Sequence, residues 1–270
     1  MKEKIVKIIC NKLESNMEEL KNDFLYAKDN INTRFIVIDD LLPKDLAFDI
    51  YNNFPSKKQM RLMSSFREKK YTFKQLNETS SILRDVTFAF QDSKVVSLIE
   101  KITEMPGQRA DSSLYAGGVS LMEKNNYLNP HIDNSHDADR RYYRTFNLLY
   151  YVTPEWKLEY GGNLELWDTK VKKSCVISSF FNRLVIMETN PYSWHSVSPV
   201  VYNKNRCCVS NYYFSDQSPT GEDYFNITSF NGRPDQKALR FFSKIDNFAR
   251  GSIRLIFKKG VGKNDIFISD

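Results

Sequence analysis

The sequence predicts a mainly β domain with flanking helices (α+β), in which a β sandwich or jelly roll is covered by an N-terminal helical layer. Aromatic residues form 14% of the chain, with 19 Phe and 15 Tyr, and such side chains favour half-buried pleated surfaces. From residue 114 onward, apolar residues alternate as they do in strands, over short segments separated by turn residues. These segments are residues 114–123, 144–153, 163–167, 174–179, 183–189, 195–201 and 206–214. A double-sheet fold of this kind has an open end at which inward-facing residues can form a site.

The chain begins with a stretch of helical spacing. Over residues 3–28, apolar residues recur three or four positions apart, which predicts an amphipathic helix packed on the sheet. A helix that binds a membrane or a partner has the same pattern, so this alternative stays open. A strand over 34–38 and a helix from about 43 to 52 follow, and Pro43 suits the first turn of that helix.

Periodicity is absent from residues 55–79, which are polar and basic with isolated apolar residues. This segment is either a loop that covers a substrate or an ordinary surface loop. Two helices are predicted after it, near 80–90 and 93–104. The second begins at Asp92-Ser93, a capping pair, and ends before Pro106-Gly107.

The C-terminal part is predicted to contain one helix, from Pro234 to about Arg250. Its expected buried stripe consists of Ala238, Leu239, Phe242, Ile245 and Phe248. Residues 253–257 and 265–268 are predicted as one or two edge strands. Because the sequence shows no repeat and no low-complexity linker, we expect a single domain. It comprises an N-terminal layer over 1–110, a jelly-roll core over 111–215, and the C-terminal helix and edge strands over 216–270.

Composition restricts the class of protein. Hydrophobic residues form 41% of the 270 residues and charged residues 27%, as in ordinary globular proteins. The net charge of +6 comes from scattered basic pairs rather than a basic helix, so nucleic-acid binding is not expected. The four cysteines lack the spacing of metal knuckles or redox pairs, and this is typical of a reducing compartment. With neither a signal-peptide core at the N-terminus nor a membrane-spanning run, we expect a cytoplasmic protein that does not bind a membrane.

The candidate metal ligands lie in His131-Ile132-Asp133 and in His195, which follows Trp194. On a strand, residues i and i+2 point to the same face, so His131 and Asp133 can bind one ion. Two imidazoles and one carboxylate form the ligand set of non-haem Fe(II) with open coordination positions. A catalytic zinc with three protein ligands and water is the alternative. The remaining histidine, His136, lies in a polar loop and is expected at the rim.

A longer set of motifs accompanies this pattern between Leu114 and Phe214. The motifs are Asn147–Tyr151, Glu155-Trp156, Gly161–Leu164, Asn182–Val185, His195–Val200, Arg206 and Tyr212–Phe214. In order and spacing they resemble the 2-oxoglutarate/Fe(II)-dependent oxygenase superfamily, nearest to its prolyl-hydroxylase-like branch. The resemblance covers about two fifths of the chain. It implies a double-stranded β-helix (jelly-roll) core that uses Fe(II), 2-oxoglutarate and O₂, with ascorbate as a stimulant.

The resemblance also implies roles for single residues. His131, Asp133 and His195 are the expected metal ligands and catalytic residues. Arg206 is the expected partner of the far carboxylate of 2-oxoglutarate, and arginine suits this role because its planar fork binds carboxylates bidentately. The phenol that usually assists the arginine is assigned to Tyr150. Some relatives keep a serine two residues after the arginine; here Cys208 stands there, and Ser210 is the nearest hydroxyl on the same face.

The implied reaction hydroxylates an unactivated C–H bond of an amino-acid-like or peptidyl substrate, including a prolyl one, with succinate and CO₂ as coproducts. The substrate is therefore a small molecule or a protein segment, and the sequence does not choose between them. A non-oxygenase metal-binding β-barrel, either a zinc protein or a sensory or structural module, is the alternative function. Arg140, Arg141 and Arg144 form either a cationic rim for an anionic substrate or a solvated turn. The oligomeric state is left open.

Overall fold

The structure, a computed structural model, describes residues 1–26, 31–256 and 267. Its α-helices are α1 (Lys2–Ser15), α2 (Met17–Leu25), α3 (Lys44–Asn52), α4 (Ser81–Ala89), α5 (Ser93–Thr103) and α6 (Lys237–Ile256). Short 3-10 helices are η1 (Leu76–Glu78) and η2 (Leu158–Tyr160). The strands are β1 (Phe35–Ile38), β2 (Arg61–Ser64), β3 (Glu68–Phe73), β4 (Arg109–Ala110), β5 (Gly118–Met122), β6 (Tyr127–Ile132), β7 (Tyr143–Tyr151), β8 (Leu164–Trp167), β9 (Ser174–Ile177), β10 (Arg183–Glu188), β11 (His195–Val197), β12 (Arg206–Ser215) and β13 (Ser229–Phe230).

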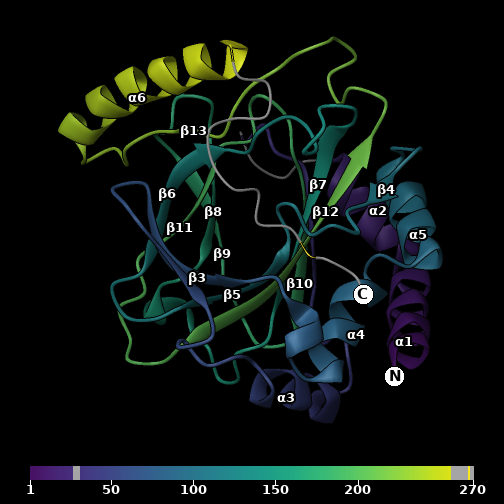
Figure 1. Cartoon of the computed structure of the whole chain (residues 1–270). Helices are drawn as coiled ribbons and strands as arrows, with labels where there is room; N and C mark the ends of the chain where they lie inside the picture. The colour runs from purple at the N-terminus through teal and green to yellow at the C-terminus, as the bar shows by residue number, and fades with distance from the viewer. Residues whose placement is uncertain (27–30, 257–266, 268–270) are drawn as a thin grey trace.

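The strands form one curled antiparallel sheet (Figure 1). Along its main path the order is β1-β10-β7-β12-β5-β3-β6-β11-β8-β9, while β2, β4 and β13 attach at the side of β3, β12 and β6. Neighbours in space are distant in sequence: β7 pairs with β10 and β12, and β11 pairs with β6 and β8. These crossed pairings make the sheet curl into the predicted jelly roll with flanking helices, so the fold class is confirmed.

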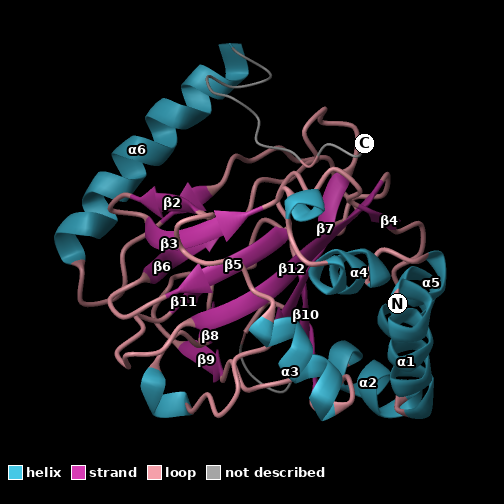
Figure 2. Ribbon diagram, turned by 60° about the horizontal axis from the view of Figure 1, so that its bottom comes forward, coloured by secondary structure: helices cyan, strands magenta, loops and turns pink. Residues whose placement is uncertain are grey.

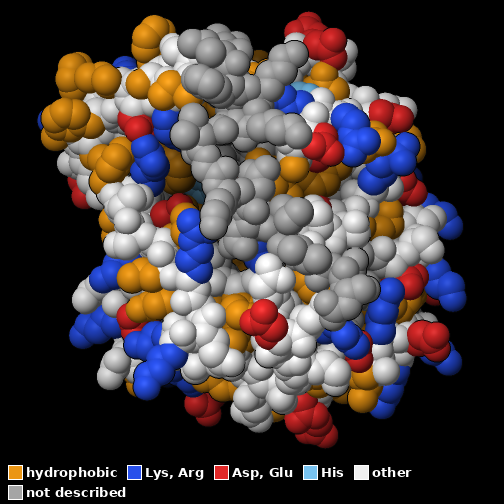
Figure 3. All heavy atoms as spheres, viewed as in Figure 1, with side chains coloured by type: hydrophobic (Ala, Val, Ile, Leu, Met, Phe, Trp, Pro, Cys, Tyr) orange, Lys and Arg blue, Asp and Glu red, His pale blue; other side chains and the backbone are white. Residues whose placement is uncertain are grey.

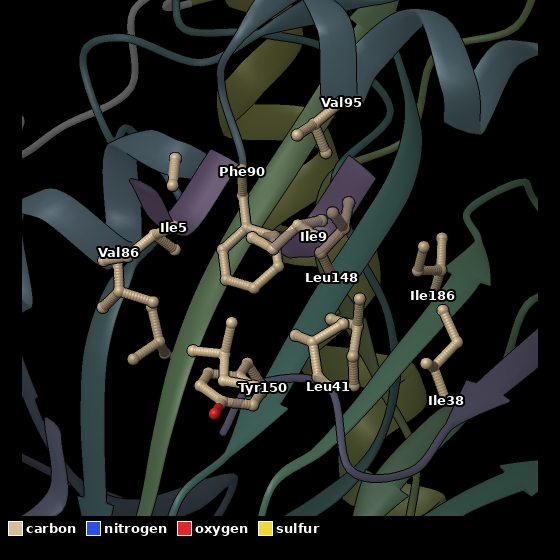
Figure 4. Close-up of a cluster of buried hydrophobic side chains, with 14 of the residues drawn as sticks. Ile5, Ile9, Ile38, Leu41, Val86, Phe90, Val95, Leu148, Tyr150 and Ile186 are labelled. Atoms are coloured by element: carbon tan, nitrogen blue, oxygen red, sulfur yellow. The ribbon is translucent and has the colours of Figure 1, made fainter. Parts of the chain in front are cut away.

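The N-terminal helices cover one face of this sheet (Figure 2). Ile5 and Ile9 from α1, Val86 from α4 and Val95 from α5 point at side chains of β7 and β10, as Figure 4 shows. The predicted helix over 3–28 is present as two, because Asn16 leaves the helical conformation with φ −119° and separates α1 from α2. The Asp92 side chain caps α5, as predicted, by accepting a hydrogen bond from the Lys94 amide at 3.1 Å.

Alternation along β7 and β12 separates the core from the interior of the roll. Leu148 and Tyr150 face the helices, whereas Leu149 and Tyr151 face the other way. On β12, Cys207 and Val209 join the helical core, while Arg206, Cys208 and Ser210, which alternate with them, line the inside of the roll. A strand with this pattern is buried on both faces, and one residue of shift would exchange its two sets of side chains.

Residues 55–79 differ from the loop that the sequence predicts. They contain the β2–β3 hairpin, in which Arg61 pairs with Thr72 and Ser64 with Lys69. Strand β3 also pairs with β5 and β6, so it bridges the two halves of the sheet. The mixed polar and apolar spacing arises because every residue of β3 is only partly buried.

The C-terminal helix corrects two predictions. It extends through residues 253–256, where an edge strand was expected. Its predicted buried stripe is wrong: Phe242, Ile245 and Phe248 are 61%, 54% and 78% exposed. The second predicted edge strand, 265–268, lies outside the described residues except for buried Phe267. Within the parts of the chain that the structure describes, no helix has the length and apolarity needed to cross a bilayer.

Candidate metal and cosubstrate site

A cavity of about 450 Å³ occupies the interior of the roll. Strands β5, β6, β7, β8, β11 and β12 contribute to its wall, and the β2–β3 hairpin reaches its mouth through Arg67 and Lys70. All three candidate metal ligands line this cavity, and Arg206 does so too. Their side chains come from strands that are far apart in sequence, so only the curling of the sheet brings them together.

His131, Asp133 and His195 form one buried cluster. His131 and Asp133 lie at the end of β6, and His195 begins β11, where it is paired directly with His131. Asp133 Oδ1 lies 3.6 Å from His131 Nε2, and its Oδ2 lies 3.8 Å from His195 Nε2. One nitrogen or oxygen atom from each residue falls within 4.8 Å of the others. This spacing fits three ligands around a single ion.

Backbone carbonyls orient both imidazoles. Nδ1 of His131 lies 3.0 Å from the Asn129 carbonyl oxygen, and Nδ1 of His195 lies 3.0 Å from that of Ser193. Because a carbonyl oxygen only accepts, each Nδ1 carries the proton and donates it. The lone pair of each ring is then on Nε2, the atom that faces the carboxylate, which is the arrangement found in metal-bound histidines.

The electrostatics of the cluster also favour a cation. Burial would raise the pKa of Asp133, but Arg144, His195 and His131 outweigh it, and the pKa is lowered to about 2. Burial, assisted by His195, lowers the pKa of His131 to about 3, so this ring is neutral at physiological pH. Asp133 Oδ2 is buried and accepts no hydrogen bond of ordinary geometry from any described residue. A carboxylate oxygen in that state is costly unless a cation satisfies it.

This charge arrangement predicts an acid-sensitive metal-free protein. The pKa of His131 is about 3 in the folded protein and 6.5 in the unfolded chain, so between these values only the unfolded chain binds a proton there. The free energy of unfolding should therefore fall as the pH drops from 6.5 towards 4. Asp133 adds its own loss only below 3.8. Urea titrations across this range should give a slope about 1.4 kcal/mol per pH unit shallower for His131→Asn than for the wild type. Equal slopes would contradict the assigned burial of a neutral imidazole.

Arg206 lies deeper in the same cavity and is 3% exposed. Its guanidinium stacks on the Tyr151 ring, 4.6 Å from the ring centre, and its Nε lies 3.4 Å from the Ser179 hydroxyl. No carboxylate among the described residues forms an ion pair with it. A buried cation of this kind requires an anionic partner, and the carboxylate of a dicarboxylic acid that also reaches the metal fits that requirement.

The structure does not bring Tyr150 to this cavity. Its ring packs in the helical core, and its hydroxyl donates to Asn182 Oδ1 at 2.8 Å (Figure 4). The adjacent Tyr151 is the phenol beside Arg206. Its buried hydroxyl has no hydrogen bond of ordinary geometry to a described residue, and burial raises its pKa, so it remains a donor. The sequence holds no signal for choosing between the two tyrosines, because β7 is buried on both faces; in the structure Tyr151 shares the face of Leu149, which lines the cavity.

Ser210 and Cys208 both line the cavity on the Arg206 face of β12. The Ser210 hydroxyl lies 3.8 Å from the Cys208 sulfur. His136, the third histidine, lies outside the cluster; it packs on Tyr143, with ring centres 4.4 Å apart, and borders a second cavity. Its position agrees with the rim location predicted for it.

Arg141 and Arg144, two of the three arginines that closely follow Asp133 in sequence, have different environments. Arg141 is exposed and pairs with Asp139 at 2.9 Å, as in a solvated turn. Arg144 is 3% exposed, lies 3.5 Å from Asp133 Oδ2 and stacks on the Tyr212 ring at 4.4 Å. Among described residues, its Nε and Nη2 have no hydrogen-bond acceptor. Arg144 is therefore a second buried cation with unused donors at the cavity, and its burial could not be read from the sequence.

Comparisons with known proteins agree with this geometry. Residues 117–214 match the model of the 2OG-Fe(II) oxygenase superfamily. Two curated relatives are prolyl 3-hydroxylases OGFOD1, from Mus musculus (31% identical over 90 residues) and Xenopus laevis (33% over 95 residues). The matches cover 30% and 32% of this chain but only 16% and 19% of those longer proteins. The chain thus spans less than a fifth of their length.

The fold has solved counterparts at low sequence identity. A prolyl-4-hydroxylase from Pseudomonas putida superposes with a TM-score of 0.55 at 13% identity, covering 76% of this chain and 100% of that one. Those from Phytophthora capsici give 0.50 at 12% identity, with 94% and 78% covered. The segment 117–214 that matches the family model contains strands β5 to β11, nearly all of β12, and the residues His131, Asp133, His195 and Arg206. Residues 117–214 of this chain therefore resemble the 2OG-Fe(II) oxygenase superfamily in sequence, and the chain resembles the solved prolyl hydroxylases in fold.

Proposed function

We propose that this protein is an Fe(II)- and 2-oxoglutarate-dependent dioxygenase that hydroxylates an unactivated C–H bond of a peptidyl substrate, releasing succinate and CO₂. One observation carries the proposal. A buried His-Asp-His cluster with an unsatisfied carboxylate oxygen shares its cavity with a buried arginine that has no carboxylate partner. Two imidazole nitrogens and a carboxylate that converge on one point suit a divalent cation, and the buried arginine suits an anion; an Fe(II)–2-oxoglutarate pair supplies both. A zinc or sensory module gives no role to Arg206.

Two groups of residues would hold the metal and the cosubstrate. His131, Asp133 and His195 would hold Fe(II), which supplies the activation of O₂ and the oxidative decarboxylation of 2-oxoglutarate. Arg206 and Tyr151 would hold the far carboxylate, replacing the Tyr150 assigned from the sequence, with Ser210 beside them. Because Asp133 would be a ligand of the iron at the position that halogenating enzymes leave for chloride, we expect a hydroxylated product rather than a chlorinated one.

The peptidyl and prolyl part of the proposal is supported by the cavity and by the printed activity of the relatives. The two curated relatives are prolyl 3-hydroxylases. Arg144 presents unused N–H donors at the metal end of the cavity, where a backbone carbonyl oxygen of a peptide would accept them.

Succinate release tests this proposal. The reconstituted protein would be assayed with Fe(II), 2-oxoglutarate and ascorbate against capped prolyl peptides, free proline and capped peptides in which alanine replaces proline. We expect succinate above the uncoupled background only with prolyl peptides, together with a mass increase of one oxygen. Turnover of free proline alone would contradict the peptidyl assignment, whereas no succinate with any substrate and no metal-dependent 2-oxoglutarate binding would contradict the oxygenase itself.

The two adjacent tyrosines provide an internal comparison. Tyr151→Phe should weaken the apparent affinity for 2-oxoglutarate by roughly tenfold or more, because a hydrogen bond to a charged group contributes about 1.5–3 kcal/mol. Tyr150→Phe should leave that affinity unchanged and lower the free energy of unfolding by about 1 kcal/mol, since it loses only the bond to Asn182. The reverse result in 2-oxoglutarate titrations would restore the assignment made from the sequence.

We also propose that the protein is located in the cytoplasm. All four cysteines are free thiols, and Cys10, Cys207 and Cys208 are buried. This usage suits a reducing compartment.

A further inference from the structure

Helix α6 is packed in the opposite sense to most surface helices. Its polar side faces the rest of the protein: Ser243 is buried, and Asn247 exchanges two hydrogen bonds with the Phe230 backbone, at 2.7 and 2.9 Å. Asp246 pairs with Arg67 from the β2–β3 hairpin and with Arg250 from its own helix. These contacts fix the orientation of α6 by polar groups rather than by an apolar seam.

The outward side of α6 is apolar. Phe241, Phe242, Ile245, Phe248 and Ile253 are 64%, 61%, 54%, 78% and 46% exposed. They recur at intervals of one, three, three and five residues, which at about 100° per residue places them on one broad face along most of the helix. Figure 3 shows orange side chains gathered at the upper left, over α6. Monomeric soluble proteins rarely expose a contiguous apolar patch of this kind without a function for it.

A basic strip borders one long edge of this apolar face. Lys237 and Lys244, two turns apart, are exposed there, and Arg240 lies between them. Arg240 donates to the Lys170 and Val171 carbonyl oxygens at 2.8 and 2.9 Å, which holds the turn 168–173 beside the helix. That turn adds three more exposed lysines. They are Lys170, Lys172 and Lys173.

The basic strip also contains a shallow pocket of about 300 Å³. Its wall consists of Lys237, Arg240 and Lys244 with Asn231, and Phe241 forms its boundary with the apolar face. Three cations around one small hollow suit a phosphate group, and the adjoining phenylalanine suits hydrocarbon. The pocket therefore joins the two kinds of surface that a phospholipid presents.

We propose that α6 docks this protein on an anionic phospholipid surface, with the phenylalanine face inserted among the acyl chains and a headgroup phosphate in the Lys237–Arg240–Lys244 pocket. A helix with aromatic residues on one face and lysines beside it lies in the membrane interface in this way. Between residues 237 and 256 there are five basic residues and one acidic residue, Asp246, which is paired internally. Two copies joined through this face would bring their lysine strips together with no acid to pair them, so charge disfavours self-association.

Vesicle co-sedimentation of the full chain tests the proposal. Vesicles of phosphatidylcholine mixed with phosphatidylserine should retain the protein, phosphatidylcholine alone should not, and added salt should release it. Phe241→Ser with Phe248→Ser should weaken binding by roughly tenfold or more, and Lys237→Ala with Lys244→Ala by a similar factor. Because these side chains are exposed, far-UV circular dichroism should show no loss of helix.

Matched controls come from the opposite side of the molecule. Phe48→Ser removes an exposed phenylalanine from α3, and Lys4→Ala with Lys7→Ala removes the same charge from α1. Both should bind vesicles as the wild type does. Equal loss in the controls would overturn the proposal, as would full competition by soluble glycerophosphoserine, which would indicate a small-anion site only. A dimer in sedimentation equilibrium that Phe248→Ser dissociates, with no vesicle binding, would replace the lipid by a second copy of the chain.

Discussion

His131→Ala and His195→Ala should each abolish iron binding and turnover while the protein stays folded. Each substitution removes an Nε2 that faces Asp133 in a buried site. Loss of a partner that merely orients a metal ligand already costs roughly 10–100-fold in affinity, so loss of a ligand should exceed that. Iron content after anaerobic reconstitution is the measurement, with succinate release as the second readout.

The third histidine is the matched control for this prediction. His136 follows Asp133 by three residues but lies outside the cluster, so His136→Ala should retain iron and activity. Asp133→Asn is the better companion than Asp133→Ala, because the amide keeps the side-chain volume and an acceptor oxygen beside buried Arg144, which lies 3.5 Å from the carboxylate. Wild-type iron content in either alanine variant of the two ligands would refute the assignment.

Arg206→Lys should weaken the apparent affinity for 2-oxoglutarate by roughly 5–150-fold, the equivalent of about 1–3 kcal/mol for a charge-assisted bond. The ammonium keeps the charge but loses the planar fork and the stacking on Tyr151. Arg206→Ala should lose more. Fe(II) binding in the absence of 2-oxoglutarate should be unchanged in both variants, because Arg206 does not contact the cluster.

Arg183 provides the control for a general effect of removing a guanidinium. It pairs with Asp39 at the protein surface, away from the cavity, so Arg183→Lys should leave 2-oxoglutarate dependence as in the wild type. If the titration curve of Arg206→Ala coincided with that of the wild type, Arg206 would have no part in holding the cosubstrate.

Local rules were enough to predict that His131 and Asp133 lie on one face, whereas His195 came from the resemblance to the oxygenases. On a strand, residues i and i+2 share a face, and the structure places His131 and Asp133 in that relation at the end of β6. Strand β6 itself was missed, because Asn129-Pro130 suggests a break in a strand. Here Pro130 lies within the strand and is buried, and its carbonyl accepts from the Asn231 amide. The alternation of side chains predicts which residues of one strand share a face, but it does not predict which strand will lie opposite.

Face assignments were harder to predict than elements. The choice between Tyr150 and Tyr151 depends on a single residue of register in a strand that is apolar on both faces, and sequence alternation gives no preference there. The stripe of α6 was found correctly as a stripe, yet its direction was wrong. Periodicity reports that a helix has an apolar face; whether that face contacts its own domain depends on tertiary contacts such as Asn247 with Phe230.

The buried arginines show a third limit. Arg144 and Arg206 are both 3% exposed, and a sequence gives no sign that a basic residue will be buried. The resemblance to the oxygenases indicated Arg206, whereas Arg144 could be located only when β7 and β12 were seen to curl around one cavity. The burial of these arginines depends on how strands distant in sequence pack around the cavity.

Anaerobic absorption titration tests the central claim most directly, that one cavity holds Fe(II) and 2-oxoglutarate together. Fe(II) and 2-oxoglutarate would be added singly and then in combination to the metal-free protein. The account predicts a weak visible charge-transfer band that requires both additions and is lost in His195→Ala. It also predicts that Arg206→Ala needs more 2-oxoglutarate to reach the same band. No band with both components present, or a band that does not depend on His195, would contradict it.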